Sequence, residues 1–198
     1  MSRVPLVVVL VSALAACRSP GSHYYTLVAT PVDSTPAATN ELQLDILPVD
    51  VPADVDRTEI VVRTGAGEVT PVETRSWIAP LSREIRRAFS DDLTRLLGAR
   101  DVAGLTPSAG VPTYRVKLAV KRFDSVLGTR AVIEAVSTMH DIASEAATLV
   151  CSHRASEDAK PGYAGIAEAH QRAVAKIATQ VADTVRSIRA GNPACAAP

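Results

Sequence analysis

Two amphipathic stretches with helical spacing constrain the fold of this chain more than any other feature. The first follows Trp77, with Pro80 suited to its first turn and Gly98 suited to its end. Its apolar residues recur at steps of three and four, as one buried helix face requires: Leu81, Ile85, Ala88, Phe89, Leu93, Leu96 and Leu97. The second stretch runs from about Tyr163 to Arg189, with an apolar stripe made of Ile166, His170, Ala173, Val174, Ile177, Val181, Val185 and Ile188. Each stretch predicts a helix with one buried face.

Several short segments have the alternation or the β-branched composition of strands. They are Tyr24–Val28, Leu42–Pro48, Glu59–Arg63, Glu68–Glu73, Tyr114–Phe123, Ala131–Met139 and Ala147–His153. Thr64–Gly67 is expected to close a hairpin, and Asp124–Thr129 and Ser156–Gly162 are expected to be loops. Strands grouped around two widely separated helices indicate the α+β class. We expect a single small sheet with both helices packed against the same face.

An apolar run near the N-terminus ends in Leu14-Ala15-Ala16-Cys17 and follows one basic residue, Arg3. The run is too short to span a bilayer, and small residues before a cysteine resemble the lipobox of bacterial lipoprotein signals. In such a signal the cysteine takes a diacylglycerol and the chain is cleaved before it. Cys17 is therefore the predicted lipidation site and membrane anchor. The alternative is an ordinary secretory signal cleaved at a site such as Ala13-Leu14-Ala15.

The lipoprotein interpretation divides the chain into four parts. These are a signal peptide over residues 1–16, a lipidated tether over 17–23, one domain over 24–190 and a C-terminal tail over 191–198. The domain is long enough to bury a sizeable core. Because aromatic residues make up only 4% of the chain while hydrophobic residues make up 47%, that core must consist mainly of aliphatic side chains.

If the protein is exported, the other two cysteines, Cys151 and Cys195, are candidates for a disulfide. They form an even pair in an oxidising compartment once Cys17 is committed to lipid, and we expect a disulfide between them. The alternative is two unpaired thiols, with Cys151 inside a strand and Cys195 on a frayed tail.

The sequence offers no recognisable constellation for catalysis or cofactor binding. The four histidines are far apart and have no metal-ligand spacing, so no metal or cofactor is expected. His170 falls on an apolar helix face, where a hydrogen-bonded core histidine is the better interpretation. Nucleophile-elbow, phosphate-loop and dinucleotide glycine patterns do not occur, and the chain is interpreted as not an enzyme. A formal net charge of +0 gives no basic excess for nucleic acid.

A set of ordered motifs resembles the ABC-type transport auxiliary lipoproteins, the PqiC family. One segment resembles the signature "V-x-V-P…L-D-R-x-x-I-V-x-R", another "R-W-x-x-P-L", and a later strand "Y-x-V…R-F-D". In order along the chain, the matching residues are Tyr24–Leu27, Leu47–Pro52, Asp56–Arg63, Arg75–Leu81, Tyr114–Val116 and Arg122–Asp124. The chain departs from the pattern at Ser76, which separates Arg75 from Trp77, and at Ser137, near the place of a tryptophan.

The resemblance implies a periplasm-facing lipoprotein with a fold like the amino-terminal domain of TolB. It implies work alongside an MCE-domain inner-membrane protein in phospholipid transport, and Arg18 after the cysteine resembles outer-membrane sorting. Arg75 and Trp77 are the candidate partner-binding residues, with the alternative that Trp77 merely fills the gap between helix and sheet. Contact with phospholipid and association of further copies stay open.

Two other classes of function are compatible with the same residues. A TolB-like lipoprotein that binds and activates a cell-wall synthase is the first alternative. A membrane-anchored hydrolase is the second, and stereospecific turnover of an ester would favour it. The gene beside this one, if it encodes an MCE protein, favours the transport role.

Overall fold

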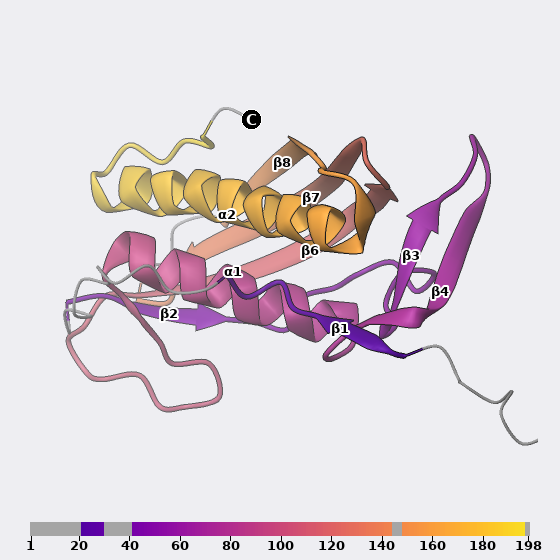
Figure 1. Ribbon diagram of the computed structural model, residues 1–198. Coiled ribbons are helices and arrows are strands. Elements are labelled where there is room, and N and C mark those ends of the chain that lie inside the picture. The colour runs from indigo at the N-terminus through magenta and orange to yellow at the C-terminus, as the bar shows by residue number, and fades with distance from the viewer. Residues whose placement is uncertain (1–20, 30–40, 144–147, 197–198) are drawn as a thin grey trace, which may run out of the picture.

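The computed structural model describes residues 21–29, 41–143 and 148–196, which form two β-sheets and two long helices (Figure 1). The larger sheet has the strand order β5-β2-β6-β7-β8 and the smaller sheet the order β1-β4-β3. The strands are β1 (His23–Tyr25), β2 (Gln43–Ile46), β3 (Glu59–Arg63), β4 (Val69–Trp77), β5 (Arg100–Asp101), β6 (Thr113–Val126), β7 (Arg130–Asp141) and β8 (Leu149–Asp158). The helices are α1 (Leu81–Leu97) and α2 (Gly162–Arg189). The predicted α+β class is confirmed.

The N-terminal 20 residues lie outside the described part, together with 30–40, 144–147 and 197–198. The signal peptide, Cys17 and most of the expected tether are among them. Within the described ranges, no helix combines the length and the hydropathy that a membrane crossing needs.

Both helices lie side by side on one face of the larger sheet, as expected (Figure 1). The strands β6, β7 and β8 pair antiparallel in succession, whereas β2 pairs parallel with both β5 and β6. Helix α2 carries many buried alanines, which let its backbone approach both the sheet and α1 closely. These alanines are Ala167, Ala169, Ala173, Ala178 and Ala182.

The ends of α1 follow the sequence signals. Pro80 is its N-cap residue, and the helix ends at Gly98, which adopts the left-handed conformation with a φ of 60°. The Ala99 N–H then donates to the Thr94 carbonyl at 3.0 Å, which satisfies one of the last carbonyls of the helix. The predicted hairpin is also present, with β3 and β4 paired antiparallel around residues 64–68.

The expectation of a single sheet was wrong, because β1, β3 and β4 form a sheet of their own. The short β2 ends at Ile46, so among the described residues the far half of β6 has no strand partner on that side beyond one bridge between Asp50 and Ala119. The β3–β4 hairpin packs beside this half of β6 through side chains instead of backbone pairing. Periodicity identifies the faces of a strand but not its neighbours, so the sequence pattern could not separate the sheets.

Strand ends differ from the sequence-based bounds at several places. The first strand is shorter than expected and ends at Tyr25, whereas β6 continues through Asp124 to Val126 before the turn at Gly128. The expected loop from Ser156 was also placed too early, because β8 extends to Asp158. Polar residues at the end of β8 pair with the start of β7, so that Asp158 lies opposite Arg130. The pairing, and not hydrophobic alternation, determines where this strand ends.

The segment after β1 is tied to both helices. The Glu84 carboxylate, buried in the first turn of α1, accepts hydrogen bonds from the Thr26 hydroxyl at 2.8 Å and from the Leu27 N–H at 2.9 Å. The Gln171 amide of α2 donates to the Thr26 carbonyl at 2.9 Å. Leu27 is itself buried in the core. The N-terminal segment is thus part of the packed body and not an appendage.

Cys151 of β8 and Cys195 of the tail form a disulfide, with their Cα atoms 5.5 Å apart. The tail is held on α2 as well, because the Ala194 N–H donates to the Ser187 hydroxyl at 3.1 Å and the Ala196 N–H to the Thr184 hydroxyl at 3.1 Å. The tail therefore closes over the C-terminal end of α2 and the edge strand β8.

Candidate functional site

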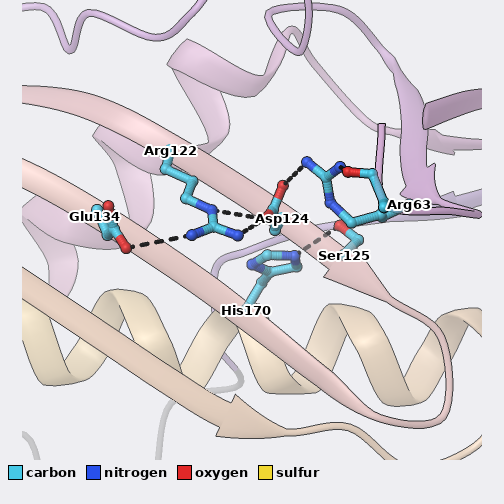
Figure 2. A network of polar contacts seen from close by, with 7 residues as sticks. Arg63, Arg122, Asp124, Ser125, Glu134 and His170 are labelled. Atoms are coloured by element: carbon cyan, nitrogen blue, oxygen red, sulfur yellow. Dashed lines mark hydrogen bonds and ion pairs between the residues drawn. The ribbon is translucent and has the colours of Figure 1, made fainter. Parts of the chain in front are cut away.

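Residues from distant motifs meet where the two sheets join, in an ion-pair network around Asp124 (Figure 2). Arg63 at the end of β3 donates to one carboxylate oxygen of Asp124 at 2.7 Å, and Arg122 of β6 donates to the other at 2.6 Å through Nε. The Asp124 side chain is only 9% exposed. The carboxylate thus links the smaller sheet to the larger one, and both of its oxygens have cationic partners.

The network continues across the face of the larger sheet that is turned away from the helices. Arg122 lies 3.5 Å from the Glu134 carboxylate on β7, and Arg154 on β8 lies 3.2 Å from the same oxygen. Charges of alternating sign therefore run from β3 to β8. The exposed ion pairs of Glu134 with Arg122 and Arg154 each contribute little to the stability of the fold. Most of the stabilisation from the network is therefore expected to come from the ion pairs of the buried Asp124.

Burial tends to raise the pKa of Asp124, but the hydrogen bonds from Arg63 and Arg122 outweigh it and hold the pKa below the ordinary value of 3.8. A carboxyl whose pKa is lowered by folding stabilises the folded state above its unfolded pKa. That stabilisation disappears as the pH falls through the lower pKa of the folded state.

We expect Asp124→Asn to lower the free energy of unfolding by about 2 kcal/mol at neutral pH, because two arginines lose their counterion. This value lies below the 3–5 kcal/mol typical of a fully buried pair, since solvent screens the partly exposed guanidinium groups. The melting temperature should fall by about 4–8 °C. The difference from the wild type should narrow as the pH drops below 3.8, the ordinary pKa of the carboxyl.

Asp183→Asn is the matched control, because Asp183 forms an exposed i,i+3 pair with Arg186 on α2. Its effect should stay within about 0.5 kcal/mol. Equal melting temperatures for Asp124→Asn and Asp183→Asn at pH 7 would contradict the central role of Asp124.

An aromatic layer lies directly beneath this network. The Phe123 ring stacks on the His170 imidazole with centroids 3.8 Å apart, and the Trp77 ring meets both at 6.3 Å with its edge. His170 is fully buried, and its Nε2 lies 2.8 Å from the Ser125 hydroxyl. Burial lowers the pKa of His170 to about 3, so the ring is neutral. The interpretation of His170 as a hydrogen-bonded core histidine is confirmed.

Of the two candidate partner-binding residues, Trp77 is a packing residue. Its ring is 2% exposed and fills the space between the smaller sheet, β6 and α2, so the suggestion that it contacts a partner is corrected. Arg75 is half-buried, and its guanidinium lies 5.3 Å above the Tyr163 ring at the start of α2. Arg75 and Trp77 lie two positions apart in β4 and therefore on the same face, so their difference in exposure comes from their neighbours: Arg75 meets Tyr163, whereas Trp77 packs on Phe123 and His170.

An exposed apolar pair lies on the smaller sheet near these residues. Tyr24 of β1 is 68% exposed and Ile78, just after β4, is 53% exposed. The two are close in space, because the Ile78 N–H donates to the Tyr25 carbonyl and Tyr24 pairs with Ser76. Sequence analysis missed this pair, although Tyr24 belongs to a motif quoted above.

A second polar cluster lies inside the fold, between β7, β8 and α2. The Ser137 hydroxyl is 2.6 Å from His153 Nε2, and His153 Nδ1 is 3.0 Å from the Gln180 carbonyl oxygen. Burial lowers the pKa of His153. The order serine, histidine and amide resembles a hydrolase constellation, but all three side chains are buried, and a nucleophile must be reached by its substrate. The cluster instead satisfies polar groups in the core.

Two of the surface pockets lie near residues described above. One, of about 230 Å³, adjoins the Asp124 network and is lined from β3, β4, β6 and the loop at residues 52–55. The other, of about 620 Å³, lies between the end of β2 and the first turns of α1 and is mostly apolar. In the described part of the chain, no three His, Cys, Asp or Glu side chains are grouped as metal ligands.

Comparison with known proteins gives a family and a fold. The profile of the family described as "ABC-type transport auxiliary lipoprotein component" matches residues 25–182. A crystal structure of an uncharacterized protein has a TM-score of 0.66 and 18% identity, covering 84% of this chain and 99% of the other. Protein XCC0632 from Xanthomonas campestris has a TM-score of 0.58 and 16% identity, covering 85% of this chain and 97% of the other. No curated protein matches the sequence.

Proposed function

Because the chain belongs to the ABC-type transport auxiliary lipoprotein family, we propose that it is an outer-membrane-anchored component of an MCE-type phospholipid transport system. In this proposal Cys17 carries the lipid, residues 18–23 form the tether, and the folded domain works on the periplasmic face without catalysing a reaction. The observation that carries the proposal is the extent of the match, which runs from the last residue of β1 to α2.

The fold supports a role in binding more than one in chemistry. The serine–histidine–amide cluster is closed to solvent, and the Asp124 carboxylate is occupied by two arginines. The features that face solvent include an apolar pair, Tyr24 and Ile78, and charged sheet residues. Such features suit contact with another protein.

We propose that Tyr24 and Ile78 form the surface for an MCE-domain partner. An exposed tyrosine beside an aliphatic side chain has the composition of an interface hot spot. The surface includes β1, the first strand after the tether, so it belongs to the part of the domain nearest the anchor in sequence.

The test is co-purification of the full chain with an MCE-domain protein of the same organism from detergent-solubilised membranes. The double variant Tyr24→Ser/Ile78→Ser should weaken the complex by about 2 kcal/mol, or about thirtyfold in Kd. Val150→Ser is the control, because Val150 is similarly exposed, at 59%, but lies on β8 of the other sheet. Light scattering on the complex counts the copies of each chain.

Two outcomes would count against this proposal. Wild-type protein that fails to bind the MCE protein in several detergents, yet binds a cell-wall synthase tightly, favours the activator role. Equal binding by the double variant and the wild type would leave the transport role intact but refute the proposed surface.

A further inference from the structure

The smaller pocket, of about 230 Å³, combines charged and apolar walls at the junction of the two sheets. Three cations line it, namely Arg63, Lys121 and Arg122, against two carboxylates, Asp54 and Asp124. The lining therefore carries one net positive charge. Apolar side chains complete the walls, among them Val55, Val61, Val69 and Phe123.

A β-bulge gathers the cations. The pairing of β6 with β7 shifts register between Val120 and Arg122, so Lys121 is the extra residue and has no partner across the ladder. The bulge allows Lys121 and Arg122, neighbours in sequence, both to line this pocket. Bulges frequently re-aim side chains next to functional sites.

The pocket retains hydrogen-bond donors that the described chain does not satisfy. The Arg63 Nε–H is buried and has no acceptor among the described residues, although the other guanidinium nitrogens contact Asp124 and the Ala66 carbonyl. Lys121 is exposed and forms no ion pair with the described residues. Since this Nε–H is closed to solvent, an anion in the pocket would meet the exposed Lys121 ammonium and the partly exposed guanidinium groups of Arg63 and Arg122.

We infer that this pocket binds a phosphate group carried as a singly charged diester. Its one net positive charge matches the charge of a diester, and the guanidinium and ammonium groups of Arg63, Lys121 and Arg122 are the donors that proteins use for phosphate oxygens. Pockets for drug-sized ligands span about 300–1,000 Å³, so this one accommodates a headgroup and not an acyl chain.

A phospholipid headgroup and a free phosphate share this chemistry. The choice of a lipid as the source rests on the transport role proposed above, whereas binding itself rests on the pocket. Titrations with glycerophosphoglycerol, the deacylated headgroup of a phospholipid, and with inorganic phosphate separate the two sources.

The test is isothermal titration calorimetry on the full chain in detergent at constant ionic strength, with NMR of the arginine Nε–H groups to locate the ligand. Glycerophosphoglycerol should bind more tightly than inorganic phosphate and shift the Arg63 Nε–H resonance. Lys121→Gln should weaken binding about fivefold, whereas Lys121→Arg should keep it near the wild-type value. Lys176→Gln, on the exposed side of α2, is the matched control and should change nothing.

Tighter binding of inorganic phosphate would support the site but assign it to free phosphate. The site is refuted if neither probe binds, if Lys176→Gln weakens binding as much as Lys121→Gln, or if acetate competes as well as the diester. Loss of MCE binding with intact anion binding would count against the proposed function alone.

Discussion

Protein that lacks the Cys151–Cys195 disulfide is expected to melt about 8–16 °C below the wild type. The bridge closes a loop with a sequence separation of 44 residues, for which chain entropy predicts about 4 kcal/mol of stabilisation. For a domain of this size, each kcal/mol corresponds to about 2–4 °C in melting temperature. Double replacement Cys151→Ala/Cys195→Ala, followed by thermal unfolding under non-reducing conditions, measures the effect.

Two comparisons make this prediction specific. Wild-type protein treated with a reductant should melt with the double variant, since both lack the same covalent link. Asn192→Ala changes the exposed tail and keeps the bridge, so its melting temperature should match the wild type. An unchanged melting temperature in reductant would show that the hydrogen bonds of Ser187 and Thr184 already hold the tail.

Replacement of Cys17 by serine is expected to move the protein completely from the membrane fraction to the soluble periplasmic fraction. Two acyl chains on one thiol supply the two signals that stable anchoring needs, at about 0.8 kcal/mol for each buried CH₂. Membrane fractionation and the intact mass of the extracted wild-type protein check this. The mass should correspond to a diacylated cysteine with residues 1–16 removed.

Cys195→Ser is the control for this experiment, because it removes a thiol elsewhere and should leave the protein in the membrane fraction. Separation of inner and outer membranes on a density gradient then tests the proposed outer-membrane location. A wild-type mass that begins at residue 16 or earlier would instead support an ordinary secretory signal.

The helices were the most predictable part of the fold. The apolar period predicts α1, and its two ends coincide with Pro80 and Gly98. The helix that the local sequence favours is thus also the helix that packs in the fold. The two sheets were not predictable, because strand neighbours depend on contacts between residues distant in sequence. The end of β8 shows the same limit, since Ser156–Asp158 has the composition of a loop and becomes strand by pairing with β7.

Sequence motifs identified several residues of the Asp124 network, but they did not predict which of these residues contact each other. Arg63 and the Arg122–Asp124 segment both ended motifs of the family resemblance, yet only the tertiary structure brings residues 61 positions apart into one ion pair. Trp77 shows the reverse case. Its place in a motif suggested a residue that anchors a partner protein. A large ring just before a helix can equally pack between sheet and helix, and the buried Trp77 does so against Phe123 and His170.

The hydrogen bonds of Thr26 and Leu27 have a consequence for the order in which the chain assembles. A chain that crosses a membrane N-terminus first delivers this segment early, yet its partner Glu84 follows 57 residues after Leu27 and Gln171 follows 145 residues after Thr26. Contacts so distant in sequence form late, after the loop between them has closed. The Thr26–Gln171 hydrogen bond therefore cannot form before the final helix has emerged, so the segment nearest the anchor gains its last contact late.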